Sequence, residues 1–219
     1  MRLAVFDCDG TLVDGQADVC WAMERAFTRA GLPSPGVAEV RRIVGLSLPA
    51  AVRSLAPELS DDQNRNVTEY YRSSFRARRE EGLLDEPLYD GIAAMLRDLH
   101  AAGWSLAVAT GKSDRGLAAC LATHGIADLF VSLQTADRHP SKPNPAMLEA
   151  ALFEAGALPG QAVMIGDTSF DMLMARSIGV AAIGVGWGYH GTNELLASGA
   201  SRVVETADAL RSALEEALP

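Results

Sequence analysis

Short apolar segments rich in strand-forming residues alternate with amphipathic stretches through most of this chain, and this alternation constrains its fold more than any other feature. Strands that alternate with helices in this way are typical of a parallel sheet covered by helices, so we predict an α/β fold. The predicted strands cover residues 2–6, 104–109, 129–133, 161–165 and 180–185, and the predicted helices cover residues 113–124, 145–156, 169–178 and 206–217.

Residues 16–84 interrupt the alternation, because they show helical spacing and contain no strand-like run. We therefore predict a helical insertion after the first strand. The insertion divides the chain into a core of residues 1–14 and 89–219 and an inserted domain of residues 15–88.

Composition and charge exclude several classes of protein. The chain has 48% hydrophobic and 21% charged residues, which is typical of a folded protein, and its formal net charge is −9. No basic block stands apart to bind nucleic acid, and the mixed charge run of residues 72–81 is interpreted as a solvated helix face. The longest apolar run, residues 178–187, is too short to span a bilayer. Three cysteines without metal-ligand spacing favour a reducing compartment, so we expect a cytoplasmic protein. From the charge and the short apolar runs we expect no nucleic-acid partner and no membrane partner.

Acidic residues follow the first predicted strand directly. Asp7 and Asp9 lie two positions apart, so their carboxylates can point the same way. Two like charges this close both stay ionised only beside a cation, and otherwise one of them keeps a proton and can act as an acid. Gly10 permits a turn whose N–H groups can face an anion, and Thr11 adds a hydroxyl. Because ligands of an open parallel sheet bind beyond the carboxyl ends of its strands, this strand end is a candidate site.

Three more candidate positions follow later in the chain. Thr110 and Gly111 place a hydroxyl and a flexible amide at the end of the second predicted strand, and a proline-rich loop presents Lys142. Asp167 lies at the tip of the fourth predicted strand, and Asp171 follows one helical turn later. Asp171 is also explained as a helix cap, whereas Asp167 is not. We predict that Gly10, Thr11 and Gly111 bind substrate.

Taken in order, four motifs resemble those of the haloacid dehalogenase-like (HAD) hydrolase superfamily over nearly the whole chain. They are Asp7-x-Asp9-Gly10-Thr11, Thr110-Gly111, Lys142-Pro143 and Gly166-Asp167-x-x-x-Asp171. The resemblance implies a HAD-like Rossmannoid parallel sheet core, and the helical insertion looks like the inserted cap domain of that superfamily. Asp14 and residues 184–189 look most like the phosphoglycolate phosphatase group.

The resemblance implies a catalytic role for each matching residue. Asp7 would be the nucleophile that takes the phosphoryl group. Asp9 would protonate the leaving oxygen and then activate water, while Thr110 and Lys142 would hold the transferring oxygens. Charge opposes the attack of a carboxylate on a dianion, so a lysine and a hard cation are needed beside it.

The same resemblance implies a Mg2+ site. The ion would lie between Asp7, the backbone carbonyl of Asp9 and Asp167. Asp171 would bind the ion through water or support the site from outside it.

Together these features predict a Mg2+-dependent phosphatase that hydrolyses a small, phosphoglycolate-like phosphate monoester through an aspartyl-phosphate. Alternatives in the same superfamily are an inorganic pyrophosphatase and a sugar-phosphate phosphatase or mutase. The apolar residues Val44, Leu46 and Leu48 disfavour a mutase and predict a small leaving group bound partly by shape. A phospho-accepting receiver-type signalling domain is the alternative from another class, but it resembles a chain little more than half this length. We expect a monomer or a homodimer.

Overall fold

Buried, strand-forming segments build one parallel sheet. In the computed structural model, which describes residues 1–218, six parallel strands lie in the order β3-β2-β1-β4-β5-β6. This order places β1 between β2 and β4, at the centre of the sheet. The strands are β1 (Leu3–Phe6), β2 (Ser105–Thr110), β3 (Phe130–Thr135), β4 (Ala162–Gly166), β5 (Ala181–Val185) and β6 (Arg202–Val204). The predicted α/β fold class is confirmed.

The predicted strand limits agree with the structure to within two residues, but the sequence pattern did not reveal β6. This strand has three residues, lies at the edge of the sheet and exposes Arg202, so it lacks the apolar run that identifies the other five. Edge strands need less apolar surface because one side of them faces solvent.

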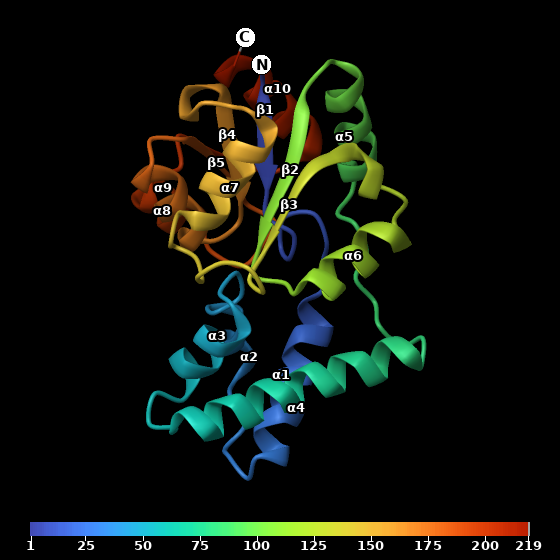
Figure 1. Ribbon diagram of the computed structural model, residues 1–219, viewed down its shortest axis with the longest axis vertical. Coiled ribbons are helices and arrows are strands. Elements are labelled where there is room, and N and C mark those ends of the chain that lie inside the picture. The colour runs from blue at the N-terminus through green and yellow to red at the C-terminus, as the bar shows by residue number, and fades with distance from the viewer. Residues whose placement is uncertain (219) are drawn as a thin grey trace.

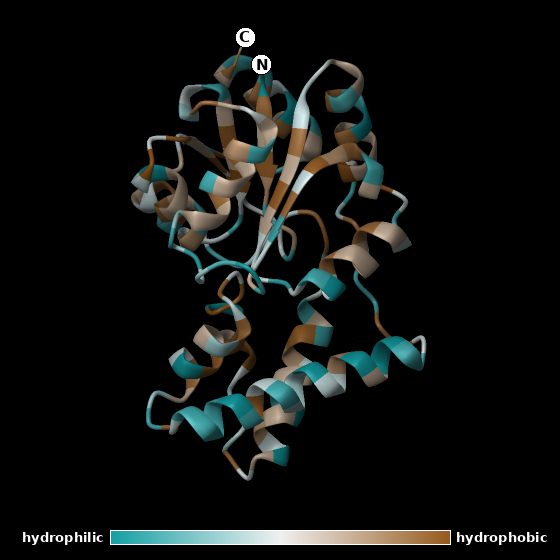
Figure 2. Cartoon of the chain, in the orientation of Figure 1, coloured by the Kyte–Doolittle hydropathy of each residue, from teal (hydrophilic) through white to brown (hydrophobic). Residues whose placement is uncertain are grey.

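Helices cover both faces of the sheet, because successive side chains of each strand point to opposite faces. Ala4 and Phe6 of β1 pack in one apolar cluster with α5, α6 and α10, and Leu3 and Val5 pack in another with α7, α8 and α9. Figure 2 shows the hydrophobic strands between the two helical layers. The helices are α5 (Ile92–Ala101), α6 (Asp114–Thr123), α7 (Ala146–Ala155), α8 (Ser169–Ser177), α9 (Thr192–Ser198) and α10 (Ala207–Ala217), and the short 3-10 turns are η1 (Ala127–Leu129) and η2 (Pro159–Gln161).

The inserted helices lie beyond the carboxyl ends of the strands, on the side opposite the two termini (Figure 1). They pack around an apolar cluster of their own, to which Met23, Phe27 and Val67 contribute. No helix of residues 1–218 is long and apolar enough to cross a membrane. The inserted helices are α1 (Gln16–Arg29), α2 (Val37–Arg41), α3 (Leu48–Leu55) and α4 (Asp61–Glu80).

Two segments connect the inserted helices to the core, and they pair with each other. Val13 forms an antiparallel bridge with Leu88, and the N–H of Asp14 donates a hydrogen bond of 2.8 Å to the carbonyl of Pro87. The chain therefore leaves the core and returns to it at adjacent points. The predicted domain limits, with a core of residues 1–14 and 89–219, stay a prediction.

Candidate active site

The chain turns sharply after β1. The N–H of Asp7 donates to the carbonyl of Ile165 at 2.9 Å, and a carboxylate oxygen of Asp7 accepts the N–H of Cys8 at 2.6 Å. Gly10 follows with φ of +81°, a conformation that glycine adopts readily. A Cβ atom at this position would lie 2.2 Å from Oδ2 of Asp167, so a side chain does not fit. The turn therefore brings the end of β1 into close contact with the end of β4.

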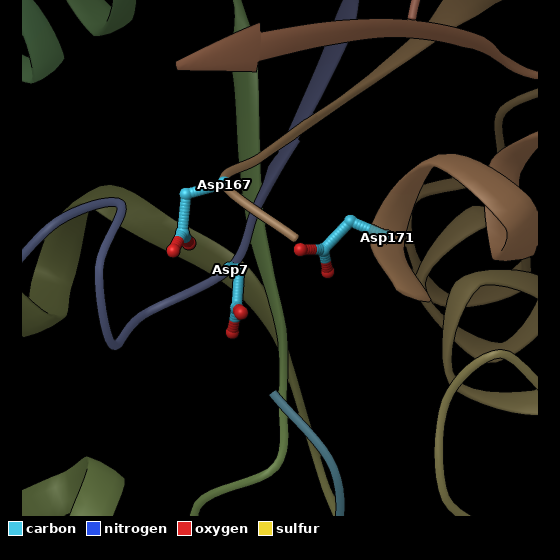
Figure 3. Close-up of side chains that lie close together, drawn as sticks. All are labelled: Asp7, Asp167 and Asp171. Carbon is cyan, nitrogen blue, oxygen red and sulfur yellow. The ribbon is translucent and has the colours of Figure 1, made fainter. Parts of the chain in front are cut away.

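Three buried carboxylates meet at these strand ends. Asp7, Asp167 and Asp171 are at most 1% exposed, and each offers an oxygen within 4.8 Å of the others. Figure 3 shows the three side chains together. Burial raises the pKa of Asp7 to about 7 although Lys142 opposes this, and burial with the nearby charge of Asp7 raises the pKa of Asp167 well above its usual value. Such a cluster needs a positive charge to remain ionised.

The donor set fits a hard divalent cation. Oδ2 of Asp7 is buried and has no hydrogen-bond partner among residues 1–218, whereas buried polar atoms are nearly always partnered. The carboxylate of Asp167 is held in place, because it accepts the Thr11 hydroxyl at 2.7 Å and the N–H of Tyr189 at 2.9 Å. Carboxylate oxygens are the protein ligands that Mg2+ prefers. The Asp9 side chain is not part of this cluster, and metal binding by its backbone carbonyl stays a prediction.

Lys142 lies buried between two of the carboxylates. Its Nζ atom is 3.0 Å from Oδ1 of Asp7 and 2.6 Å from Oδ1 of Asp171. Burial alone would lower the pKa of Lys142, but Asp171 and Asp7 outweigh it and raise this pKa, so the amine is protonated. The other oxygen of Asp171 accepts the N–H and the hydroxyl of Thr168, at 3.1 and 2.7 Å, and thereby caps α8. Asp171 is thus a helix cap that also holds Lys142.

Asp9 faces a different lysine. Nζ of Lys112 lies 3.0 Å from Oδ1 of Asp9, in an ion pair outside hydrogen-bond geometry, and 2.5 Å from Oε1 of Glu86. Burial alone would lower the pKa of Lys112, but Asp9 and Glu86 outweigh it and raise this pKa. The sequence pattern did not identify Lys112 or Glu86 as site residues. The one feature of the sequence that could have indicated Lys112 is its position two residues beyond the end of β2.

A cavity of about 480 Å³ lies between the core and the inserted helices. Asp7, Asp9, Thr110, Gly111 and Lys112 line its core side, and residues 43–49 with one face of α4 line the other. The cavity therefore brings the predicted nucleophile and the predicted acid to one wall.

Thr11, predicted to bind substrate, donates its hydroxyl to Asp167 and does not line this cavity. Gly10, with the same predicted role, does not line the cavity either. Thr110 lines the cavity, and its hydroxyl accepts the N–H of Lys112 at 3.2 Å. The contacts of Gly10, Thr11 and Gly111 with substrate stay predictions.

The interpretation of residues 72–81 as a solvated helix face is incomplete, because Arg72 and Arg76 are exposed but the face that they share also borders the cavity. Arg72, Arg76 and Arg79 of α4 line the cavity, together with Phe75. The sequence shows that these arginines are spaced by four and three residues, and this spacing places them on one side of the helix. Only the tertiary structure places that side over the site.

Comparison with known proteins gives the family. Residues 4–185 match the family model of the haloacid dehalogenase-like hydrolases. A phosphoglycolate phosphatase of Vibrio vulnificus (strain CMCP6) is 32% identical over 206 residues, which is 90% of this chain and 89% of that protein. A probable phosphatase, IndB, of Dickeya dadantii is 35% identical over 209 residues, which is 93% of this chain and 89% of that protein.

A solved structure agrees with these relatives. The crystal structure of a predicted phosphoglycolate phosphatase from Haemophilus somnus superimposes with a TM-score of 0.84 at 25% identity, and covers 97% of this chain and 98% of that one. The family model spans the positions of all four motifs, from Asp7 to Asp171. The chain therefore belongs to the haloacid dehalogenase-like hydrolase family.

Proposed function

We propose that this phosphatase hydrolyses a small phosphate monoester, with phosphoglycolate as the first candidate, through a covalent phosphate on Asp7. The family and the phosphatase names of the Vibrio and Dickeya relatives support the reaction class, and the name of the Vibrio relative supports the substrate. The observation that supports the mechanism best is the position of Asp7, which lines the cavity while its carboxylate contacts the buried Lys142.

Asp7 is suited to attack phosphorus. Its Oδ2 atom has no hydrogen-bond partner among residues 1–218, while the N–H of Cys8 and the amine of Lys142 hold Oδ1. One carboxylate oxygen is therefore oriented and the other is available. The positive charge of Lys142 offsets the repulsion between the carboxylate and the incoming phosphate.

A Mg2+ ion held by Asp7 and Asp167 would supply further positive charge beside the transferring phosphoryl group. Thr11 and the N–H of Tyr189 orient Asp167 for this role. Asp171 would contribute from outside the ion's closest ligands, because one of its oxygens is paired with the charged amine of Lys142 and the other accepts two hydrogen bonds from Thr168. The partners of Asp167 are neutral, and each of its oxygens accepts one hydrogen bond.

Asp9 would move the protons. It lies on the same cavity wall as Asp7, where its carboxyl group would give a proton to the leaving oxygen and later take one from the attacking water. General acid–base help of this kind contributes about 10² to 10⁴ in rate. Lys112 holds the Asp9 side chain through an ion pair and thereby orients it.

The inserted helices would close the site during the reaction. Residues Val44, Leu46 and Leu48 line the cavity opposite the catalytic wall, so a closed cavity excludes bulk water from the phosphorylated intermediate. The family match favours this phosphatase over a receiver-type signalling domain. Assays with pyrophosphate and with sugar phosphates as substrates distinguish these alternative activities from the main proposal.

The test compares Asp7→Asn with the wild type. Released phosphate is measured from phosphoglycolate, hexose phosphates and pyrophosphate, with and without Mg2+. We expect Mg2+-dependent release with phosphoglycolate preferred, and a loss of at least about a thousandfold in Asp7→Asn without loss of the fold. Asp90→Asn removes an exposed carboxylate away from the site and should retain activity. Near-normal release by Asp7→Asn would show that Asp7 is not the nucleophile.

A further inference from the structure

Three exposed arginines on the cavity wall have no acidic partner among residues 1–218. Arg72 and Arg76 lie on α4, and Arg115 lies in the first turn of α6. None of them forms an ion pair or a hydrogen bond with residues 1–218. Arg115 is also unfavourably placed for its helix, because the helix dipole disfavours a cation at the N-terminal end. Helix stability therefore does not explain the charge of Arg115.

The other arginines of α4 show that partners are available on this helix. Arg65, Arg78 and Arg79 each form an ion pair with a carboxylate. Arg72 and Arg76 are the two that face the cavity without such a pair. The unpaired arginines of α4 are thus confined to the side that faces the site.

The acidic residues of the cavity do not neutralise these arginines. Asp7 and Asp9 are already paired with Lys142 and Lys112, and Asp137 accepts a backbone N–H at the start of α6 at 2.9 Å. The chain as a whole carries a net charge of −9, so its overall field repels anions. A local group of unpaired guanidinium groups is therefore the feature of this cavity that attracts a second anion.

The cavity has room for more than a phosphoryl group. Its volume of about 480 Å³ lies within the range of sites for small organic ligands, which is about 300–1,000 Å³. With the phosphoryl group at Asp7, the leaving group would extend toward α4, past the apolar side chains of Val44 and Phe75. Its far end would then meet the arginines.

We propose that Arg72, Arg76 and Arg115 form a second anion subsite, and that the preferred substrate is a phosphate monoester whose leaving group carries a carboxylate or a second phosphate. The planar guanidinium group binds both of these anions through paired hydrogen bonds. This inference rests on the proposed function, because it requires the phosphoryl group to lie at Asp7. The apolar loop of residues 44–48 predicts that the leaving group is bound partly by its shape. The arginine subsite would also recognise the negative charge of the leaving group.

The first test uses substrates that differ only at the far end. Phosphoglycolate is compared with 2-hydroxyethyl phosphate, and 3-phosphoglycerate with glycerol 3-phosphate, so that a carboxylate replaces a neutral CH2OH group in each pair. Fructose 1,6-bisphosphate against fructose 6-phosphate tests a second phosphate. We expect at least about a tenfold higher kcat/KM for the anionic member of the preferred pair, as charge-assisted hydrogen bonds predict. The pair with the largest ratio identifies which anion the subsite takes.

The second test removes the arginines. The double variant Arg72→Gln with Arg76→Gln, and separately Arg115→Gln, should raise KM for the anionic substrate about 10- to 100-fold with little change in kcat. Activity on 2-hydroxyethyl phosphate should stay within about threefold of the wild type. Arg65→Gln is the matched control, because it removes the same charge from α4 outside the cavity and should leave the substrate preference intact. Arg115 lies on α6, so a rise in KM in Arg115→Gln cannot result from a disturbance of α4.

The outcomes separate the two proposals. A wild type that hydrolyses the neutral esters as well as the anionic ones overturns the subsite and leaves the phosphatase proposal standing. Equal losses on anionic and neutral substrates in the arginine variants also overturn it, since they indicate a structural effect. A wild type that hydrolyses none of these esters, while circular dichroism shows it folded, overturns the proposed function and the subsite with it.

Discussion

Gly111 lies where the core and the inserted helices approach each other closely at the site. A Cβ atom built on Gly111 would lie 2.5 Å from the carbonyl oxygen of Leu46 and 2.9 Å from that of Gly45. Both neighbours are backbone atoms, so no side-chain rotation relieves the contact. Other residues can adopt the backbone conformation of Gly111, because its φ angle is not positive. Gly111→Ala therefore tests the contact between the two parts and not the backbone of the loop.

The size of the effect follows from this geometry. An ordinary contact begins at 3.4 Å, so alanine requires the loop at Leu46 to move away from the core by about 0.9 Å. A misplacement of about 1 Å in a catalytic arrangement costs about 10²-fold in rate. We expect kcat/KM of Gly111→Ala to fall about 100-fold. The free energy of unfolding should change by less than about 1 kcal/mol, since the clash is relieved by separation of the two parts and alanine restricts the unfolded chain.

The assay is phosphate release from phosphoglycolate in parallel with thermal unfolding. Gly160→Ala is the matched control, because no atom lies within 4 Å of the added Cβ, and it should retain both activity and stability. Gly111→Val, with a larger side chain, should lose more activity than Gly111→Ala. An alanine variant with activity within about threefold of the wild type would refute the reasoning, and so would a loss fully explained by unfolding.

Three other predictions test single groups. Lys112→Met removes the partner of Asp9, so kcat/KM should fall about 10- to 100-fold for an alkyl phosphate and less for p-nitrophenyl phosphate, whose leaving group hardly needs a proton. Equal losses on both would mean that Lys112 does not act through Asp9. Asp167→Asn should raise the Mg2+ concentration for half-maximal activity at least about tenfold, and an unchanged Mg2+ titration would exclude Asp167 as a ligand. Burial lowers the pKa of His190, so below the usual value of 6.5 this residue binds more protons in the unfolded chain, and its contribution to the free energy of unfolding should fall as the pH drops from 7 to 5. The raised pKa values of Asp7 and Asp167 act in the opposite direction, so the readout is the difference in free energy of unfolding between the wild type and His190→Gln. This difference should shift against the wild type as the pH drops, and a difference that does not change with pH would contradict the role of His190.

Much of the fold could be predicted from the sequence, because buried parallel strands need near-continuous apolar runs and surface helices need helical spacing. These local requirements identified β1 to β5 and most of the helices of the core. They did not identify β6, or α5 and α9. Since β6 and α9 have only three and seven residues, local patterning carries little signal there.

The sequence by itself also predicted which groups carry the chemistry. Asp7 and Asp167 stand at strand ends where neither packing nor turn formation explains a carboxylate, and parallel strands present their carboxyl ends at one edge. The tertiary structure alone decided the partners of these groups. In the folded chain Lys142 lies between Asp7 and Asp171, and Lys112 forms an ion pair with Asp9.

The same division holds for the arginines of α4. Their spacing shows that they share one side of a helix, but a helix carries no information about what that side faces. The packing of α4 on α1 and α3 placed this charged side across the cavity from the core and made it a cavity wall. Contacts between residues far apart in the sequence depend on how whole elements pack, and local pattern does not specify that packing.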